Sequence, residues 1–240
     1  MRAAVRGERD SALFIMRKYV DSILFPVTCS ICGNLTHADR ALCDYCMEYN
    51  FEPANPEGYY SCSGHFPPDY IEVQDALWKY DKKGHLQSLL MKLKYSGRRD
   101  IGFQCGRLLG RKWRYSSHYV PQSNWLLVPV PLHWAKYWKR GYNQAALIAQ
   151  GFSDQTGVPV CPSNTIFRNR FTRTQTGFTL EERQKNIKHV FEVNKPQNLH
   201  RQRIIIIDDV FTTGATTYEL AGIIAREEVK SIMIYTIGVA

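Results

Sequence analysis

The chain has 240 residues, 44% of them hydrophobic and 12% aromatic, and a formal net charge of +9. This length allows one sizeable hydrophobic core, or one core with a small additional module, and the composition excludes a disordered chain. The positive charge indicates an anionic partner, without choosing among nucleic acid, a phosphorylated metabolite and an anionic membrane surface.

The N-terminal apolar segment, residues 12–25, is broken by Arg17, Lys18 and Asp21. This pattern predicts an amphipathic helix and not a signal peptide. No uninterrupted apolar stretch elsewhere approaches the length of a membrane span. We therefore expect no membrane span and a cytoplasmic location.

Four of the seven cysteines form two Cys-x-x-Cys pairs, separated by ten residues: Cys29 with Cys32, and Cys43 with Cys46. Two such pairs supply four thiolates for one tetrahedral site, a ligand set that favours structural zinc. A short segment with so few apolar residues needs a metal to fold. Free or redox-active thiols are the alternative, and they fit a single pair better than two.

The remaining cysteines do not complete a second metal site by spacing. Cys62 and His65 form at most a half-site, because no second half is visible in the sequence. Cys105 and Cys161 stand among apolar residues and are expected in the hydrophobic core.

Apolar patterns alternate between strand-like and helical spacing beyond a loop rich in Pro, Gly, Tyr and Ser at residues 51–69. The predicted strands are residues 71–80, 125–130, 158–160, 190–193, 204–207 and 231–237. The predicted helices are residues 84–95, 101–113, 144–152, 180–188 and 218–227. Such alternation predicts an α/β fold with a parallel sheet flanked by helices. We expect a helix and cysteine module over residues 1–66 and an α/β domain over residues 67–240.

Residues 79–115 carry eleven Lys and Arg residues against two Asp residues, with aromatic residues interleaved. Single-stranded DNA is bound by such a combination, since cations neutralise its phosphates and aromatic rings stack on its bases. Within this stretch we expect Lys94, Arg98 and Arg99 to contact DNA. The alternative is a pair of amphipathic helices with basic outer faces, whose aromatic residues belong to the core.

A second polar segment follows the predicted strand 125–130. Lys136, Lys139 and Arg140 are suited to a pyrophosphate, because charge-assisted hydrogen bonds are the strong ones. Asn143 and Gln144 add neutral donors and acceptors that can fix an orientation. A solvated basic loop is the alternative.

Residues 171–188 combine a turn at Gly177 with a charged helix. Two interpretations stay open. The segment can be a mobile lid over a phosphorylated ligand, or an exposed helix with ion pairs such as Glu181 with Lys185.

Residues 204–217, with the sequence IIIIDDVFTTGATT, are the most informative part of the chain. Four isoleucines predict a strand buried on both faces, and Asp208 and Asp209 follow at its carboxyl end, where open α/β sheets bind ligands. A turn rich in hydroxyl groups then leads into a helix N-terminus, which suits a phosphate. This turn consists of Thr212, Thr213, Gly214, Ala215 and Thr216. A sugar phosphate satisfies both the turn and the carboxylates.

Two alternatives explain less of this stretch. An N-capped helix accounts for one threonine but not for two adjacent carboxylates, and a strand-end Mg²⁺ site leaves the turn unexplained. The common glycine-rich nucleotide loops are absent from the sequence. Residues 208–216 resemble the loop that binds 5-phosphoribosyl-1-pyrophosphate (PRPP) in type I phosphoribosyltransferases.

Motifs spread over nearly the whole chain, from about Val20 onward, show a wider resemblance. They are residues 24–26 (LFP), the two cysteine pairs, residues 92–100 (KLKYSGRRD), residues 128–132 (VPVPL), residues 140–145 (RGYNQA), Gln175-Thr-Gly177 with Glu182, Arg183 and Asn186, and residues 208–216. Together they resemble the ComF family of competence-associated phosphoribosyltransferase-like proteins. The family leads us to expect a further cysteine pair, but Cys-Ser-Gly-His stands at residues 62–65.

The resemblance implies a zinc-binding module joined to a type I phosphoribosyltransferase domain, and a link to DNA uptake in natural transformation. By analogy, Asp208 and Asp209 would hold the ribose hydroxyls of PRPP, and residues 212–216 its 5-phosphate. Residues 129–144 would form the pyrophosphate side, with Mg²⁺ bridging the pyrophosphate. The implied partners are PRPP or a related ribose phosphate, single-stranded DNA, and competence or recombination proteins.

Two functions are compatible with these features. The first is a binding protein that recognises PRPP and handles single-stranded DNA. The second is an active phosphoribosyltransferase that transfers ribose 5-phosphate from PRPP to a nitrogen acceptor, displacing pyrophosphate. The sequence contains residues suited to bind the phosphates of PRPP but no recognisable pocket for a nitrogen acceptor. This favours the binding protein over the active transferase. A purely structural scaffold would leave Asp208 and Asp209 without a purpose.

Overall fold

The computed structural model describes residues 26–37, 40–54, 67–121, 123–168 and 190–240. Several sequence predictions lie outside the described residues. They are the helix in residues 12–25, the pair Cys62 and His65, and the segment 171–188 with its ion pair and helix.

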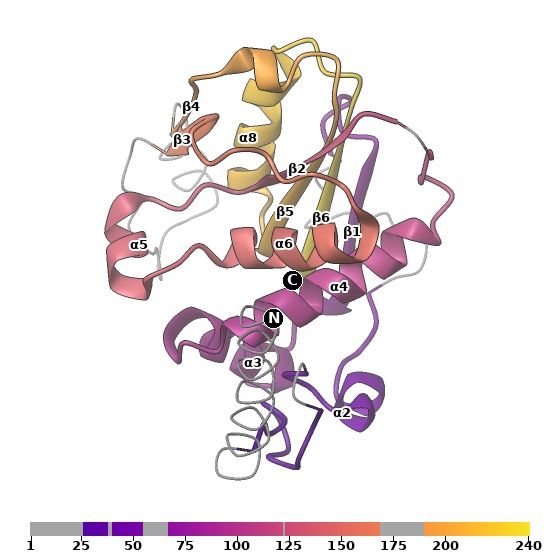
Figure 1. Cartoon of the computed structure of the whole chain (residues 1–240), viewed down its shortest axis with the longest axis vertical. Helices are drawn as coiled ribbons and strands as arrows, with labels where there is room; N and C mark the ends of the chain where they lie inside the picture. Colours follow the sequence, from indigo (N-terminus) through magenta and orange to yellow (C-terminus); the bar gives the residue numbers. More distant parts are fainter. Residues whose placement is uncertain (1–25, 38–39, 55–66, 122, 169–189) are drawn as a thin grey trace, which may run out of the picture.

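The predicted parallel sheet is confirmed (Figure 1). Its strands run in the order β1-β6-β5-β2, and every neighbouring pair is parallel. The strands are β1 (Val73–Lys79), β6 (Ser231–Val239), β5 (Arg203–Phe211) and β2 (Trp125–Pro129). The strand predicted at residues 158–160 is reduced to one parallel bridge, between Val160 and Leu127 beside β2.

The isoleucine run of β5 is buried on both faces, as predicted. Ile205 and Ile207 pack into a core that also contains apolar residues of three helices. These helices are α3 (His85–Tyr95), α4 (Arg99–Arg114) and α6 (Gln144–Thr156). Ile204 and Ile206 pack into a second core, together with α8 (Ala215–Ala225). The sheet therefore lies between two helical layers, which buries strand residues whichever face of the sheet their side chains point to (Figure 1).

The structure corrects the predictions at the end of β5. The strand continues beyond Asp209 to Phe211, so both carboxylates belong to the last residues of the strand and do not follow it. The following helix begins at Ala215, three residues earlier than predicted, because Gly214 adopts a left-handed conformation and serves as its N-cap. Only glycine adopts this conformation readily.

A short helix, α5 (Trp134–Arg140), occupies a region for which no helix was predicted. The side chain of His133 accepts a hydrogen bond from the backbone N–H of Ala135 and caps its start. Histidine is not among the usual N-cap residues, so the capping signal was not visible in the sequence. The helix ends at Gly141, which is left-handed.

A second, two-stranded sheet stands apart from the parallel one. It pairs β3 (Ile166–Arg168) with β4 (Phe191–Val193) in antiparallel orientation. The strand predicted at residues 190–193 therefore exists, but it does not extend the main sheet, and β3 was not predicted. A 3₁₀ helix, η1 (Pro196–Asn198), connects β4 to β5.

The cysteine module packs directly onto the α/β layers. The side chain of Gln104 in α4 accepts a hydrogen bond from the N–H of Leu42 and donates one to its carbonyl oxygen, at 2.9 and 3.3 Å. Phe51 stacks on Trp78 of β1 with ring centroids 4.4 Å apart. The module includes a helix, α2 (Asp44–Tyr49), whose Cys46 belongs to the same core as α3 and α4. The boundary predicted at residue 66 falls outside the described residues and stays a prediction.

No helix in the described ranges has both the length and the apolarity needed to cross a bilayer. The predicted core positions Cys105 and Cys161 are both buried. Trp113, which the sequence placed in the basic stretch, is completely buried and makes edge contacts with Trp125.

Helices α4 and α6 approach each other closely at glycine. A Cβ on Gly106 would lie 2.0 Å from the carbonyl oxygen of Ile148, and a Cβ on Gly151 would lie 2.0 Å from that of Phe103. Backbone carbonyls cannot move aside as flexible side chains do. These two glycines therefore allow both helices to cover the same face of the sheet.

Replacing Gly151 with alanine is expected to force the two helices apart and to lower the free energy of unfolding by about 1–3 kcal/mol, as overpacking does. Urea denaturation measures the change. Gly222→Ala in α8 is the matched control, since the nearest atom to its new Cβ is the Tyr70 hydroxyl oxygen at 3.2 Å. Equal effects of the two substitutions would contradict this account of the packing.

Candidate functional site

A cavity of about 350 Å³ opens at the carboxyl edge of the parallel sheet, beside the ends of β2 and β5. Residues from both predicted halves of the site line it. From the β5 end these are Asp208, Asp209, Thr212, Thr213, Gly214, Ala215 and Thr216, and from the β2 end they are Lys136, Arg140, Asn143 and Gln144. Segments about 65 residues apart in the sequence thus meet at one cavity, as expected where neighbouring parallel strands end.

Lys94 and Arg168 also line this cavity, and neither was predicted to belong to it. Lys94 lies in α3 and was assigned to DNA contact from its place in a basic stretch. Arg168 is the last residue of β3, and no motif in the sequence identified it. Both residues belong to elements that folding alone brings to the carboxyl edge of the sheet, so their sequence positions did not reveal this location.

The two carboxylates have different surroundings. Asp209 forms an ion pair with Lys94, with Oδ2 and Nζ 2.8 Å apart, and its backbone N–H donates to Asp208 Oδ1 at 2.8 Å. Burial, followed by the charge of Asp209, raises the pKa of Asp208 to about 7. Near neutral pH, the Asp208 side chain is therefore present both as a protonated acid and as a carboxylate.

Cationic side chains outnumber carboxylates around the cavity. Burial lowers the pKa of Lys136, and the charges of Arg168 and Arg140 lower it further. Burial also opposes the charge of Lys94, but Asp209 outweighs this effect and raises the pKa of Lys94. Lys136 is thus a cation without full local compensation, so a bound anion would stabilise its charge.

The turn before α8 leaves its helix N-terminus open. Gly214 is the N-cap, and no side chain caps the first turn. A Cβ at this position would lie 2.6 Å from Phe211 Cζ and 2.7 Å from Tyr218 Cε2, so both the space and the conformation require glycine. Unpaired N–H groups at a helix N-terminus and the positive end of its dipole together favour a phosphate.

Asn143 and Gln144 play different parts. The Asn143 side chain caps α6 by accepting from the N–H of Ala145, and it donates to the carbonyl oxygen of Val130, each at 3.0 Å. These two bonds fix the loop, and the predicted role of Asn143 in orienting a ligand stays a prediction. Gln144 is buried, and its Nε2 has no hydrogen-bond partner among the described residues. This buried donor at the cavity wall is therefore available to an acceptor in the cavity.

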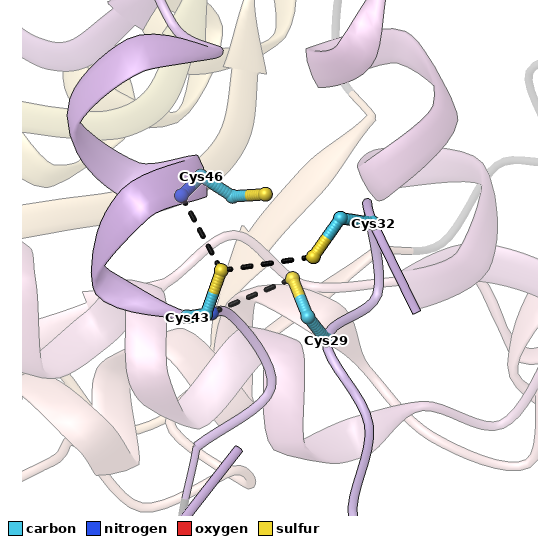
Figure 2. A group of neighbouring side chains, drawn as sticks. All are labelled: Cys29, Cys32, Cys43 and Cys46. Atoms are coloured by element: carbon cyan, nitrogen blue, oxygen red, sulfur yellow. Dashed lines mark hydrogen bonds between the residues drawn. The ribbon is translucent and has the colours of Figure 1, made fainter. Parts of the chain in front are cut away.

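The four predicted cysteines converge on one point (Figure 2). Their sulfur atoms all lie within 4.8 Å of one another, and Cys32 Sγ and Cys43 Sγ are 3.8 Å apart. A tetrahedron with metal–sulfur bonds of about 2.3 Å separates its sulfurs by about 3.8 Å. The cluster therefore fits a structural metal ion, and its four ligands leave no open coordination position.

Backbone N–H groups stabilise a thiolate at Cys29, one of the four cluster residues. The N–H groups of Ile31 and Cys43 both donate to Cys29 Sγ at 3.4 Å. Burial opposes ionisation of Cys29, but hydrogen bonds from the backbone outweigh it and lower the pKa to about 6. Gly33, with φ of +77°, forms the turn after the first pair.

The three residues predicted for DNA contact do not form one exposed surface. Lys94 is paired with Asp209 inside the cavity. Arg98 binds Asp100 at 2.7 Å and donates to the carbonyl oxygen of Thr28, so it holds the cysteine module. Arg99 is exposed, and its guanidinium lies 4.9 Å from the ring centre of Tyr142. Their role in DNA binding stays a prediction.

Known proteins similar to this chain carry names that refer to DNA utilization or to competence. DNA utilization protein YhgH of Salmonella typhimurium is 30% identical over 212 residues, which span 86% of this chain and 88% of that protein. Competence protein F of Haemophilus influenzae is 34% identical over 110 residues, which span 45% of this chain and 48% of that protein. This chain belongs to the ComF family.

Two other comparisons add less about this ComF-family chain. No family model matches it. A solved structure of glutamine PRPP amidotransferase from B. subtilis covers 61% of this chain and 30% of its own, with 13% identity and a TM-score of 0.39.

The zinc prediction for the cysteine cluster is tested by metal analysis of the purified protein. We expect about one tightly held zinc ion per chain, and loss of that ion together with the native fold in Cys43→Ser. Cys161→Ala is the control, because Cys161 lies outside the cluster in the second core. If Cys43→Ser kept both its metal and its fold, the cluster would not be a metal site.

The raised pKa of Asp208 predicts a pH-dependent stability. The folded protein keeps a proton on Asp208 up to about pH 7, whereas the unfolded chain releases it near pH 4, so stability falls as the pH rises through this window. Asp208→Asn removes that loss and is expected to raise the free energy of unfolding at pH 8 by at least about 1 kcal/mol, with little change at pH 4.

Denaturation in urea at both pH values measures this difference. Asp69→Asn is the control, since Asp69 is an exposed carboxylate. A gain from Asp208→Asn that is the same at both pH values would show that Asp208 does not titrate in this range.

Proposed function

We propose that the cavity at the carboxyl edge of the sheet binds PRPP, or a closely related ribose phosphate, together with Mg²⁺. The protein then acts in DNA uptake and handles single-stranded DNA in the cytoplasm. Zinc, held by the four cysteines, has a structural role in this proposal. Competence or recombination proteins are further partners.

One observation carries the proposal: three kinds of group meet at one cavity of about 350 Å³. An open helix N-terminus suits the 5-phosphate, a pair of carboxylates suits the ribose hydroxyls, and a set of cations suits the pyrophosphate. A nucleic-acid groove or a simple metal site would require only part of this set. PRPP carries all three complementary groups in one molecule.

In this proposal, different residues contact different parts of PRPP. The backbone of residues 212–216 would receive the 5-phosphate, and Asp208 and Asp209 would accept hydrogen bonds from the ribose hydroxyls. Lys136 and Arg140 would contact the pyrophosphate, and Gln144 would donate its unpaired N–H to it. When bound with the pyrophosphate, Mg²⁺ supplies further charge neutralisation and needs few protein ligands.

Support for the DNA part comes from the relatives' names and from charge. DNA utilization protein and competence protein F are names that concern DNA and transformation. A net charge of +9 favours association with a polyanion. Because Lys94 and Arg98 have partners in the fold, Arg99 is the most accessible of the three residues predicted to contact DNA.

Active phosphoribosyl transfer is the second candidate. A second cavity of about 790 Å³ adjoins the first and shares Pro131, Leu132, Asn143 and Arg168 with it, so the structure offers space that the sequence did not reveal. An active transferase would release pyrophosphate from PRPP only when a nitrogen acceptor is present. Pyrophosphate release that depends on an added nucleobase would favour this function over binding alone.

Calorimetric titration with PRPP and Mg²⁺ tests the proposed site. We expect saturable binding that weakens at least tenfold in Asp208→Asn/Asp209→Asn, because the ribose hydroxyls lose a charged acceptor at Asp209, contributing about 1.5–3 kcal/mol, and a partly ionised one at Asp208. Comparing ribose 5-phosphate with 2-deoxyribose 5-phosphate checks the same contact, and the deoxy compound should bind more weakly.

The Asp69→Asn protein is the matched control, since it loses an exposed carboxylate away from the cavity. A folded, metal-loaded protein that binds neither PRPP nor ribose 5-phosphate would refute the proposal. Equal affinity for the ribose and deoxyribose compounds would refute the role of the two carboxylates.

A further inference from the structure

Exposed aromatic side chains surround the second cavity. It lies between α5, α6 and β3, and its wall includes Trp134 and Tyr137 of α5 and Phe167 of β3. Trp134 is 66% exposed, Tyr137 51% and Phe167 43%, although large aromatic residues are usually well buried. An exposed group of this size and kind indicates a binding surface.

Helix α5 presents these rings together with cations. Its seven residues, WAKYWKR, contain three aromatic and three basic side chains and no acidic one, and none of the seven is buried. The helix lies at the periphery of the fold, which leaves its outer surface accessible (Figure 1). Lys139 is exposed, while Lys136 and Arg140 line the first cavity.

The lining of the second cavity suits the faces and edges of nucleobases. Leu147 and Val160 supply apolar walls, and Gln150 and Ser163 supply donors and acceptors at its edge. Arg168 is the one charged residue among its described lining residues, so the cavity itself repels no anion. Aromatic rings beside cations bind single strands, because bases stack on the rings and phosphates pair with the cations.

The first cavity is a poor site for DNA. Its carboxylates suit a ribose diol, whereas deoxyribose lacks the 2′-hydroxyl group. The second cavity has no carboxylate among its described lining residues. Charge and sugar chemistry therefore assign the two ligands to different cavities.

We propose that the second cavity and the aromatic face of α5 bind single-stranded DNA, with Trp134 and Tyr137 stacking on its bases and the basic residues of α5 attracting its phosphates. The inference rests on the proposed function and specifies the surface that contacts DNA. This surface differs from the one expected from the sequence at Lys94, Arg98 and Arg99. Because both cavities share Arg168, binding of PRPP and DNA should be coupled, and each ligand must change the affinity of the other by the same factor.

Fluorescence anisotropy with a labelled oligothymidylate at low salt tests the surface. Trp134→Ala/Tyr137→Ala is expected to weaken binding at least tenfold, since stacking on one aromatic side chain contributes about 1–3 kcal/mol per base. Trp134→Phe/Tyr137→Phe keeps the rings and should retain most of the affinity. Tyr115→Ala is the matched control, because Tyr115 is 86% exposed, lies in the basic stretch and does not line the cavity.

PRPP calorimetry on the same alanine variant separates the two proposals, because neither substituted residue lines the first cavity. Unchanged PRPP binding with lost DNA binding supports the inference. Wild-type protein that binds PRPP but no oligonucleotide would refute the DNA part of the proposed function, and the inference with it.

Three other results would overturn the inference alone. The first is DNA binding that the alanine variant retains, and the second is DNA binding that Tyr115→Ala abolishes to the same degree. The third is loss of self-association in the alanine variant, seen by size-exclusion chromatography, with unchanged DNA binding. That last result would make the cavity a contact between copies of this chain.

Discussion

Burial of β5 on both faces is the constraint on which the rest of the structure depends. Ile204 to Ile207 leave no side of this strand for solvent, so helices must cover the sheet on each face. The close glycine contact between α4 and α6 allows one of these layers to form. With the strand fixed between β2 and β6, Asp208 and Asp209 must lie at the carboxyl edge, where a buried carboxylate needs compensating charge.

That need for charge connects the fold to its ligands. Lys94 reaches Asp209 from one layer, and Arg168 approaches Asp208 from the small antiparallel sheet on the other. These cations remain in excess over the carboxylates, which leaves the cavity selective for an anion. Arg168 also lines the aromatic cavity, so one side chain borders both the proposed ribose-phosphate site and the proposed DNA surface.

Features encoded in contiguous residues could be predicted from the sequence, and features that depend on tertiary approach could not. The isoleucine run, the Asp-Asp-to-Thr turn and the cysteine pairs each carry their chemistry within a few residues. By contrast, Lys94 was read as part of a basic stretch because its partner Asp209 lies more than one hundred residues away. Helix α5 was not predicted because its N-cap is His133, which is not a usual capping residue. The second cavity could not be predicted because separate elements of the chain come together to form it.

The most direct test of the central claim is a crystal structure of the protein with PRPP and Mg²⁺. Our account predicts the 5-phosphate at the N-terminus of α8, the ribose on Asp208 and Asp209, and the pyrophosphate beside Lys136, Arg140 and Gln144. Displacement of Lys94 from Asp209 by the ribose would fit the same account. Ligand density elsewhere on the molecule, or the reverse orientation with the pyrophosphate at α8, would contradict it.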